Sequence, residues 1–445
     1  MRLRTATRRQ FLGSAAALAA TGPLVPGFAA PLLGSDYRAL VCIFLYGGND
    51  GNNMVVPLDS ASYAAYAKAR GNAGAGGLAL TQSSLAPLNG SSLGLHGALA
   101  PLAEVWNQGH LAVQANVGTL VRPLSKLEFG AGGAVVPSNL FSHSDQQSQW
   151  QQGGSGLAHS TGWGGRIADL QARAAVPAVI SVSGNSVFIN GAATDGLALS
   201  SSGGFAVKGF GGNPARNPLY SLYTNLLQLP YANAEQRAAA AVLNQGLRAS
   251  ELLNKALSAS SSVAGLFAGQ SNSLAKQLLA VAKMLEARSS LGVNRQIFFV
   301  SIGGFDTHND QLSQQGGLFG QLGPALKSFH DATMQLGLGS QVTSFTASDF
   351  ARTLQPASGG GTDHAWGNHQ FVLGGAVKGG LYGRMPQFAL GGPDDVSSEG
   401  RWLPSTASDQ MSATLAAWIG VSAGDMTGLF PNLANFAQPN LGYFG

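Results

Sequence analysis

The chain has 445 residues, of which 45% are hydrophobic and 10% are charged, a composition that can build a large core and excludes a disordered chain. Four of the 25 Lys and Arg residues precede the first acidic residue, Asp36, and the remaining 25 − 4 = 21 balance 21 Asp and Glu. Beyond Asp36 the chain therefore lacks the basic field that favours nucleic acid or an acidic membrane surface, and we expect no nucleic-acid partner.

The N-terminus carries the pattern of a targeting segment. Thr7-Arg8-Arg9-Gln10-Phe11-Leu12 is a twin-arginine motif, and a weakly apolar run and the small-x-small signal Gly27-Phe28-Ala29 follow it. We predict a signal peptide over residues 1–29 and a mature domain over residues 30–445, exported through the twin-arginine (Tat) translocon to the periplasm or out of the cell. The apolar run is shorter than the roughly 20 residues of a membrane-spanning helix, so no stable membrane insertion is expected.

After the signal, short apolar runs alternate with helical stretches, a rhythm typical of an α/β fold. Mainly apolar runs predict strands at residues 40–45, 111–115, 179–182, 297–300, 342–346 and 371–373, and the wholly apolar run at 297–300 indicates a buried strand of a parallel sheet. Apolar residues at helical spacing predict helices at 98–107, 322–336 and 410–419, the last one capped by Ser408 or Asp409.

Two segments depart from this rhythm. Residues 188–210 are rich in Gly and Ser with alternating apolar residues, which predicts short antiparallel strands. Residues 233–288 are dominated by Ala, Leu, Gln and Lys at helical spacing, which predicts two or three helices. These helices form either a helical insertion or cap, or an ordinary crossover connection between strands.

Three of the predicted strands run into a loop that carries an aspartate. Asp50 follows the first strand, Asp306 follows the strand at 297–300 with His308 two residues on, and Asp349 follows the next strand. Ligands bind beyond the carboxyl ends of parallel strands, so these side chains are expected to meet. Together with His364 they form an oxygen and nitrogen ligand set that suits Zn²⁺ or Mn²⁺, as one or two ions. The alternative for each aspartate is a turn or cap residue.

The stretch Ser142-His143-Ser144 carries the candidate nucleophile. Ser144 and Gln147 fit a capping box, which predicts a helix start whose free amides attract an anion. Ser142 or Ser144 is then the attacking hydroxyl, or else part of a simple helix cap. We take Ser142, His143 and Arg352 as the candidate catalytic residues, with Arg352 either contacting an anionic substrate or forming a surface salt bridge. The histidines without a partnered motif are expected to be bystanders: His96, His110, His159 and His330.

The chain combines its twin-arginine start with a series of specific motifs: Gly47 to Asn53, Phe141-Ser142-His143, Gly303 to His308, Gly361 to His364, Gly400 to Pro404 and Asp409-Gln410. This combination covers essentially the whole mature chain and resembles the bacterial DUF1501 proteins. That family in turn resembles the alkaline phosphatase and sulfatase superfamily. The resemblance implies a doubly wound, mostly parallel α/β sheet with helices on both faces over a two-metal site. It also implies hydrolysis of small anionic phosphate or sulfate esters.

The resemblance implies a role for each site residue. Asp50 matches the first-strand metal ligand, and Asp306 with His308 matches the pair that binds the other metal. His364 matches the late histidine of that second site, and Asp349 matches the carboxylate after the following strand. The remaining match is Ser142, to the nucleophile.

Other features of the sequence leave alternatives open. One residue separates Asp306 from His308 where the superfamily usually has three, and Phe350 stands where it usually has a histidine. These departures favour a non-catalytic extracytoplasmic binding or assembly protein that retains the fold and at most one metal. A third reading, a GDSL-like esterase, matches Gly47-Gly48-Asn49-Asp50 to a G-x-N-D block, but the nucleophilic serine needed on an earlier strand is missing.

Overall fold

The computed structural model of the chain describes residues 36–72, 75–154, 160–171, 174, 176–194, 196–199 and 217–445. The predicted signal peptide, residues 1–29, lies outside them. The chain divides into two compact units, one made of residues 1–31 and 206–251, the other of residues 32–205 and 252–445. The second unit contains the sheet and the candidate site.

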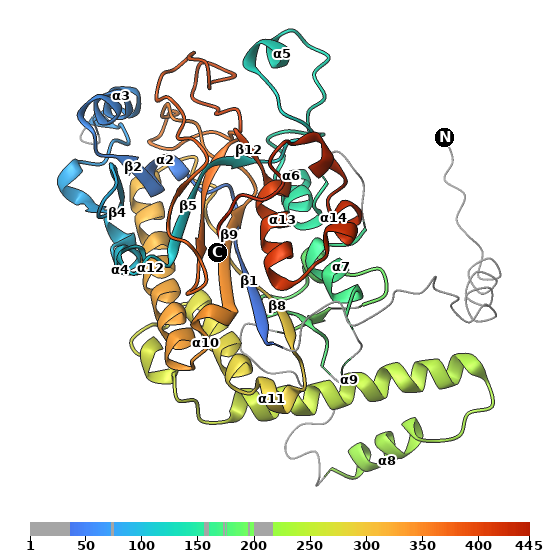
Figure 1. The fold of residues 1–445 in the computed structure, drawn as a ribbon. Helices are drawn as coiled ribbons and strands as arrows, with labels where there is room; N and C mark the ends of the chain where they lie inside the picture. Colours follow the sequence, from blue (N-terminus) through green and yellow to red (C-terminus); the bar gives the residue numbers. More distant parts are fainter. Residues whose placement is uncertain are drawn as a thin grey trace. The chain divides into compact units, whose positions relative to one another are not determined.

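The second unit is built on a nine-stranded sheet in the order β11-β5-β10-β9-β1-β8-β6-β7, with β12 paired to β5 (Figure 1). The strands are β1 (Arg38–Leu45), β5 (Leu111–Gly118), β6 (Val179–Ser181), β7 (Leu197–Ala198), β8 (Arg295–Ile302), β9 (Val342–Ser348), β10 (Asn368–Leu373), β11 (Gly380–Tyr382) and β12 (Thr406–Ala407). β10 runs antiparallel to β9 and β5, whereas the other neighbours pair in parallel. The predicted mostly parallel sheet and its six predicted strands are confirmed.

Helices cover both faces of this sheet. On one face lie α4 (Pro101–Asn107), α10 (Ser273–Glu286) and α12 (Gln311–Gln335) (Figure 1). On the other lie α6 (His143–Gln152), α7 (Trp163–Asp169), α13 (Ser408–Ile419) and α14 (Ala423–Leu429). Alternate side chains of β1, those of Leu40, Cys42 and Phe44, join one apolar cluster with this second group of helices. Because strand side chains alternate between faces, a run that is apolar throughout is needed to serve both helical layers.

The order of the central strands makes the fold doubly wound. β8 and β9 follow one another in the chain through α12, yet they lie on opposite sides of β1 and both pair with it in parallel. The connection therefore passes over β1, and the loops after β1, β8 and β9 leave the sheet at one edge. Such a switch point is the preferred place for a binding site in an open α/β sheet.

Smaller elements complete the described chain. A second sheet joins β2 (Val55–Pro57), β4 (Leu93–His96) and β3 (Leu85–Pro87) in the order β2-β4-β3. The short helices are α2 (Gly51–Met54), α3 (Ser60–Arg70), α5 (Lys126–Gly130) and α11 (Arg288–Leu291). α8 (Pro218–Leu227) belongs to the smaller unit, and α9 (Ala234–Ser258) crosses from it into the larger one. That residues 233–288 form an insertion or cap stays a prediction.

Two local expectations are wrong. In the segment 188–210, β7 pairs in parallel with β6 rather than antiparallel, and residues 187–189 form a 3-10 turn; residues 200–210 lie outside the described part. Helix α13 begins at Ser408 itself, so neither Ser408 nor Asp409 is the cap. Instead Gln410 Oε1 accepts the amide of Ala407 at 2.8 Å, which satisfies the backbone donor just before the helix.

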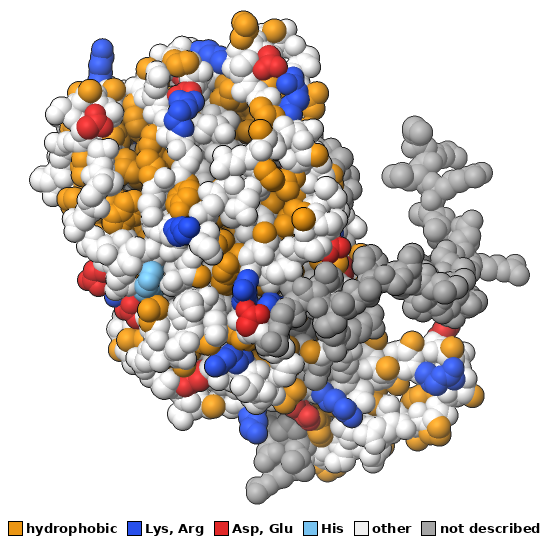
Figure 2. All heavy atoms as spheres, in the orientation of Figure 1, with side chains coloured by type: hydrophobic (Ala, Val, Ile, Leu, Met, Phe, Trp, Pro, Cys, Tyr) orange, Lys and Arg blue, Asp and Glu red, His pale blue; other side chains and the backbone are white. Residues whose placement is uncertain are grey.

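Within the described residues, no helix combines the length and the apolar character that a membrane crossing requires. Charged side chains are scattered over the face shown in Figure 2 rather than gathered into one patch.

Asp409 offers a test of how α13 is fixed to the sheet unit. Its carboxylate is buried and accepts the amide of Gly154, the second residue after α6, with both oxygens at 3.1 Å. Burial raises the pKa of Asp409 from 3.8 to about 6, although the Gly154 amide and the charge of Arg166 oppose the shift. Between pH 4 and 6 the folded state therefore keeps a proton that the unfolded state has released.

We expect this group to lower the free energy of unfolding by about 2 to 3 kcal/mol as the pH rises from 4 to 6. Above pH 6 the loss is complete, because the carboxylate is then charged in both states. Asp409→Asn should remove this component while keeping an oxygen for Gly154. Urea denaturation of both proteins at pH 4, 5, 6 and 7 measures the difference, and parallel curves would contradict the buried, protonated carboxyl.

Candidate functional site

The loop after β1 passes between the loops after β8 and β9, and two glycines make this possible. Gly47 has φ 112° and a side chain there would come within 2.4 Å of the amide nitrogen of Asp306. Gly48 has φ 78° and a side chain there would come within 2.5 Å of the Phe350 ring. Only glycine tolerates both the positive φ and the close approach. The loop after β1 is therefore packed against the backbone of the loop after β8 and against the Phe350 side chain that follows β9.

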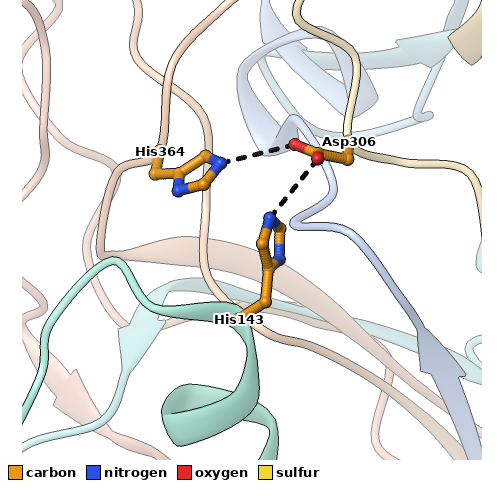
Figure 3. Close-up of side chains that lie close together, drawn as sticks. All are labelled: His143, Asp306 and His364. Carbon is orange, nitrogen blue, oxygen red and sulfur yellow. Dashed lines mark ion pairs between the residues drawn. The ribbon is translucent and has the colours of Figure 1, made fainter.

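Three side chains from different segments meet in this place (Figure 3). Asp306 follows β8, His143 is the first residue of α6, and His364 lies in the loop before β10. One ligand atom from each lies within 4.8 Å of the others, and this is the group that could hold a metal ion among the described residues. Asp306 Oδ2 lies 3.5 Å from His143 Nε2, and Asp306 Oδ1 lies 3.4 Å from His364 Nε2.

His143 is oriented by Asp349, the aspartate that follows β9. His143 Nδ1 lies 2.7 Å from Asp349 Oδ2, and because a carboxylate only accepts, Nδ1 carries the proton. Asp349 Oδ2 also accepts Gln147 Nε2 at 2.7 Å and the amide of Gly47 at 3.2 Å. The hydrogen bond to Asp349 raises the pKa of His143, against the opposing effect of burial. Its Nε2 faces Asp306 and can take either a proton or a metal ion.

His364 is oriented by a backbone carbonyl. Its Nδ1 donates to the carbonyl oxygen of Phe141 at 2.8 Å, which leaves the lone pair on Nε2, the atom that faces Asp306. Burial lowers the pKa of His364, the hydrogen bond to Phe141 opposes that shift, and the nearby Arg352 charge adds to it. Phe141 has φ 70°, a conformation that costs a bulky residue about 1 to 3 kcal/mol. It is held there because Gln146 Oε1 accepts its amide at 2.6 Å.

His308 extends the cluster outward. Its Nε2 lies 3.0 Å from Asp306 Oδ1 and 3.1 Å from His364 Nε2, and its Nδ1 lies 3.4 Å from Asp363 Oδ1. His308 and Asp363 also line an open polar pocket of about 430 Å³, together with Thr353 and Glu399 among others. His308 therefore lies between this pocket and the cluster.

Arg352 lies behind Asp306 and is fully buried. Its Nη2 donates to Asp306 Oδ1 and to the carbonyl of Gly47, its Nε to the carbonyl of Gly48 at 3.0 Å, and its Nη1 to the carbonyl of Thr362 at 2.8 Å. Burial alone would raise the pKa of Asp306, but the hydrogen bond and charge of Arg352 outweigh it and lower that pKa. These contacts make Arg352 a positioning residue, whereas the sequence suggested contact with an anionic substrate or a surface salt bridge.

Asp50, the predicted first-strand ligand, has a different set of partners. It is buried and forms an ion pair with Arg70 of α3, whose Nη2 lies 2.6 Å from Oδ1 and 2.5 Å from Oδ2. Oδ1 also accepts the amide of Asn52 at 3.0 Å, and Oδ2 accepts Gln311 Nε2 at 2.5 Å. Asp50 is not a member of the His143, Asp306 and His364 group. Four predicted ligands thus lie close together in the structure: Asp306, His308, Asp349 and His364. Asp50, in contrast, is paired with Arg70.

Gln311, at the start of α12, connects Asp50 to the loops of the cluster. Its Oε1 accepts the hydroxyl of Thr307 at 3.0 Å and that of Thr362. Thr307 lies between Asp306 and His308, and Thr362 lies two residues before His364. The buried amide therefore fixes both loops against the carboxylate after β1.

Phe350, which follows Asp349, packs against two rings of the cluster. Its ring centroid lies 4.7 Å from that of His143 and 4.6 Å from that of His364, and its side chain is buried. Because the Phe350 ring packs against both imidazoles, it restricts the orientation of each. Where the resemblance would have placed a histidine, this chain has an apolar support.

The serines at the start of α6 are placed otherwise than expected. The helix begins at His143 with Ser142 as N-cap, so the predicted capping box of Ser144 and Gln147 is wrong. Ser142 Oγ donates to Asp145 Oδ2 at 2.5 Å and lies 3.2 Å from Ser144 Oγ, while Gln147 reaches Asp349. The predicted helix start is right to within a residue, and its first amides lack intrahelical acceptors. The nucleophilic role of Ser142 stays a prediction.

A divalent ion fits the donors of this cluster. His143 Nε2 is buried and has no hydrogen-bond partner among the described residues, an unusual state for a buried polar atom. The far nitrogens of His143 and His364 are tied to Asp349 and to the Phe141 carbonyl, which is how protein ligands of metals are usually oriented. Nitrogen and carboxylate donors without thiolate suit Zn²⁺ or Mn²⁺.

Sequence reasoning missed several residues that shape the site. Gln147 lies four residues after His143, so helical spacing puts both on one face, and that spacing was a usable signal. Gln311 and Arg70 had no local signal, because their partners come from distant loops. The predicted bystanders His96, His110 and His330 lie outside the cluster, with His110 and His330 contacting each other at 3.1 Å; His159 lies outside the described residues.

Comparison with known sequences identifies a family match over most of the chain. The family described as "Protein of unknown function (DUF1501)" matches residues 37–399. No curated protein is significantly similar in sequence to this chain.

Solved structures similar to the chain include a synthase and two phosphatases. The lipoteichoic acid synthase LtaP from Listeria monocytogenes aligns with a TM-score of 0.37 and 8% identity, over 91% of this chain and 77% of LtaP. A mutant of alkaline phosphatase PafA aligns with a TM-score of 0.26 and 10% identity, over 73% of this chain and 64% of PafA. Alkaline phosphatase from the Antarctic bacterium TAB5 aligns with a TM-score of 0.24 and 10% identity, over 78% of this chain and 95% of that phosphatase. All three TM-scores lie below 0.5, so these likenesses assign no activity to the chain.

Arg352 should be indispensable to the stability of the site loops. Arg352→Met leaves Asp306 and three carbonyls without their buried donor, and we expect the free energy of unfolding to fall by about 3 to 5 kcal/mol. The matched control is Arg122→Met, which removes an exposed ion pair with Glu128 and should leave the free energy of unfolding nearly unchanged. Urea denaturation of the three proteins measures both effects. Equal losses in the two variants would contradict the role given to Arg352.

Proposed function

This chain belongs to the DUF1501 family, and we propose that it is an exported, metal-dependent hydrolase of phosphate or sulfate esters. The observation that carries the proposal is the meeting of His143, Asp306 and His364 at the carboxyl ends of the central parallel strands. His308 and Asp349 are proposed to assist, the first as a further donor and the second by holding His143.

The proposed chemistry uses one bound ion and the residues around it. A divalent ion, Zn²⁺ or Mn²⁺, held by His143, Asp306 and His364 would polarise a phosphoryl or sulfuryl oxygen of the ester. Ser142 is the proposed nucleophile. Attack would form a bond from Ser142 Oγ to phosphorus or sulfur as the bond to the ester's alcohol oxygen breaks, and the hydroxyl proton would pass to Asp145, whose Oδ2 lies 2.5 Å away; water would then release the phosphate or sulfate. The free amides in the first turn of α6 suit the negatively charged oxygens of the same ester.

The proposed substrate is a small anionic ester. Its alcohol portion would occupy the polar pocket of about 430 Å³ beyond His308. The walls named above offer hydroxyl and carboxylate groups, so that portion is expected to be polar and small rather than a long alkyl chain.

Two observations favour a second candidate, a binding or assembly protein that keeps a single ion. The Phe350 ring packs directly on His143 and His364, and the Ser142 hydroxyl hydrogen bonds to Asp145 rather than to a member of the cluster. A chain with this arrangement would hold an ion and a ligand without turning the ligand over.

We expect purified protein to contain Zn²⁺ or Mn²⁺ and to hydrolyse at least one of three ester classes: aryl phosphates, phosphodiesters and aryl sulfates. Stripping the ion with a chelator should abolish turnover, and adding the ion back should restore it. Asp306→Asn and His364→Gln should lower bound metal and rate together, because each removes a donor. The control is His96→Asn, which retains an acceptor for the Ala98 amide at a position outside the cluster.

Ser142→Ala separates catalysis from metal binding. This variant should keep its ion and lose about a thousandfold or more in kcat, whereas Ser144→Ala should lose little. Loss in Ser144→Ala alone would move the nucleophile to Ser144, and full activity in both would leave neither serine as nucleophile. A metal-loaded wild type that turns over none of the esters would reject the hydrolase in favour of the binding protein.

Export through the twin-arginine route is part of the proposal, and it rests on Arg8 and Arg9 of the N-terminal motif. Replacing both arginines by lysine should leave the precursor in the cytoplasm, because the pair is the feature read by that pathway. Cell fractionation with an antibody to the chain measures the outcome. Unchanged recovery outside the cytoplasm would show that the motif is not used.

A further inference from the structure

We propose that the site holds one divalent ion rather than two, and that Arg70 takes the place of a second cation beside Asp50. The inference rests on the metal site of the proposed function and fixes its stoichiometry. The sequence left one or two ions open, because three strands end in an aspartate. The structure separates these aspartates by what surrounds each carboxylate.

The Asp50 carboxylate has no free acceptor position. A carboxylate offers about four lone-pair positions, and here each oxygen receives two donors. Arg70 Nη2 lies 2.6 Å from Oδ1 and 2.5 Å from Oδ2, which bridges them as a cation would. The amide of Asn52 fills the second position on Oδ1 at 3.0 Å, and Gln311 Nε2 fills the second position on Oδ2 at 2.5 Å.

Burial makes this arrangement stable against exchange with an ion. The side chains of both Arg70 and Asp50 are 0% exposed, so neither can turn to water when a competing cation arrives. A metal ion binding Asp50 would have to displace a buried guanidinium, whose charge would then be left uncompensated. Arg70 therefore excludes an ion from this carboxylate by both charge and position.

Asp306 differs in each of these respects. Its side chain is 46% exposed, and Arg352 engages only Oδ1. Oδ2 has His143 Nε2 as its neighbour, at 3.5 Å, and that nitrogen has no hydrogen-bond partner among the described residues. The carboxylate after β8 thus has an oxygen left for an ion, and the carboxylate after β1 does not.

The summed charge of the three carboxylates and the two arginines also favours a single ion. The three carboxylates after β1, β8 and β9 contribute −3, and Arg70 and Arg352 contribute +2, which leaves −1. One divalent ion brings the sum to +1, a value suited to an anionic ester. A second divalent ion would bring the sum to +3 next to two buried guanidiniums that cannot move away, and these like charges would repel one another.

The test measures ion stoichiometry and affinity, independently of turnover. Wild-type protein stripped of metal is titrated with Zn²⁺ in a calorimeter, and metal content is checked by elemental analysis after dialysis. We expect one ion per chain. The double variant Asp50→Asn with Arg70→Met removes both charges of the buried pair together, which avoids leaving either one unpaired. It should still bind one ion, with the Kd changed by about tenfold or less.

Asp306→Asn is the matched comparison, because it makes the same substitution at the aspartate proposed as a ligand. It should weaken Zn²⁺ binding by more than about a hundredfold. Two ions per wild-type chain, or loss of the ion from the double variant, would overturn the role given to Arg70 while leaving a metal-dependent hydrolase intact. No bound ion in the wild type would overturn both. If the double variant does not fold, the stoichiometry of the wild type alone decides.

Discussion

The guanidinium of Arg352 is the interaction on which the geometry of the site depends. The carbonyls of Gly47 and Gly48 come from the loop after β1, Asp306 from the loop after β8, and Thr362 from the segment that leads to His364. Arg352 itself follows β9, so one side chain joins every loop that leaves the switch point. Its planar fork of five donors allows this, whereas a lysine offers a single point of attachment. Glycine is needed at positions 47 and 48 because the loop after β1 must come close enough for Arg352 to reach the carbonyls of these two residues.

The site is supported by side chains that do not face it. Gln311 spans from Asp50 to the hydroxyls of Thr307 and Thr362, and Phe350 fills the space behind the two imidazoles. Each of these contacts fixes a backbone segment or a ring plane rather than a reacting atom. These contacts hold the side chains of His143, Asp306 and His364 at fixed distances from one another. A metal site needs such fixed distances, and exposed loops rarely provide them.

The sequence located the site because its strongest signal was topological. An apolar strand that ends in an aspartate predicts a carboxylate at the edge of a parallel sheet, and this placed Asp306 and Asp349 correctly with respect to each other. The same pattern could not separate Asp50 from them, because its partner Arg70 lies on a helix 20 residues away and carries no local mark of the pairing. The start of α6 was predicted to within a residue from a capping box of Ser144 and Gln147, but the residue that caps the helix is Ser142. Serines at neighbouring positions offer the same hydroxyl, and only tertiary contacts decide which residue ends the loop.

The pairing of β1 has a consequence for the order in which the chain can fold. Arg38 lies opposite Arg295, and Ala39 lies opposite Val342, so the first strand has no partner in the sheet until most of the chain has been synthesised. Closing loops of that length slows folding, and an apolar strand that waits unpaired is exposed to aggregation. The last donor of the cluster, His364, leaves the ribosome later still. The cluster of His143, Asp306 and His364 is accordingly a property of the finished chain, and a nascent or truncated product would expose β1 without gaining the side chains that the completed sheet brings together.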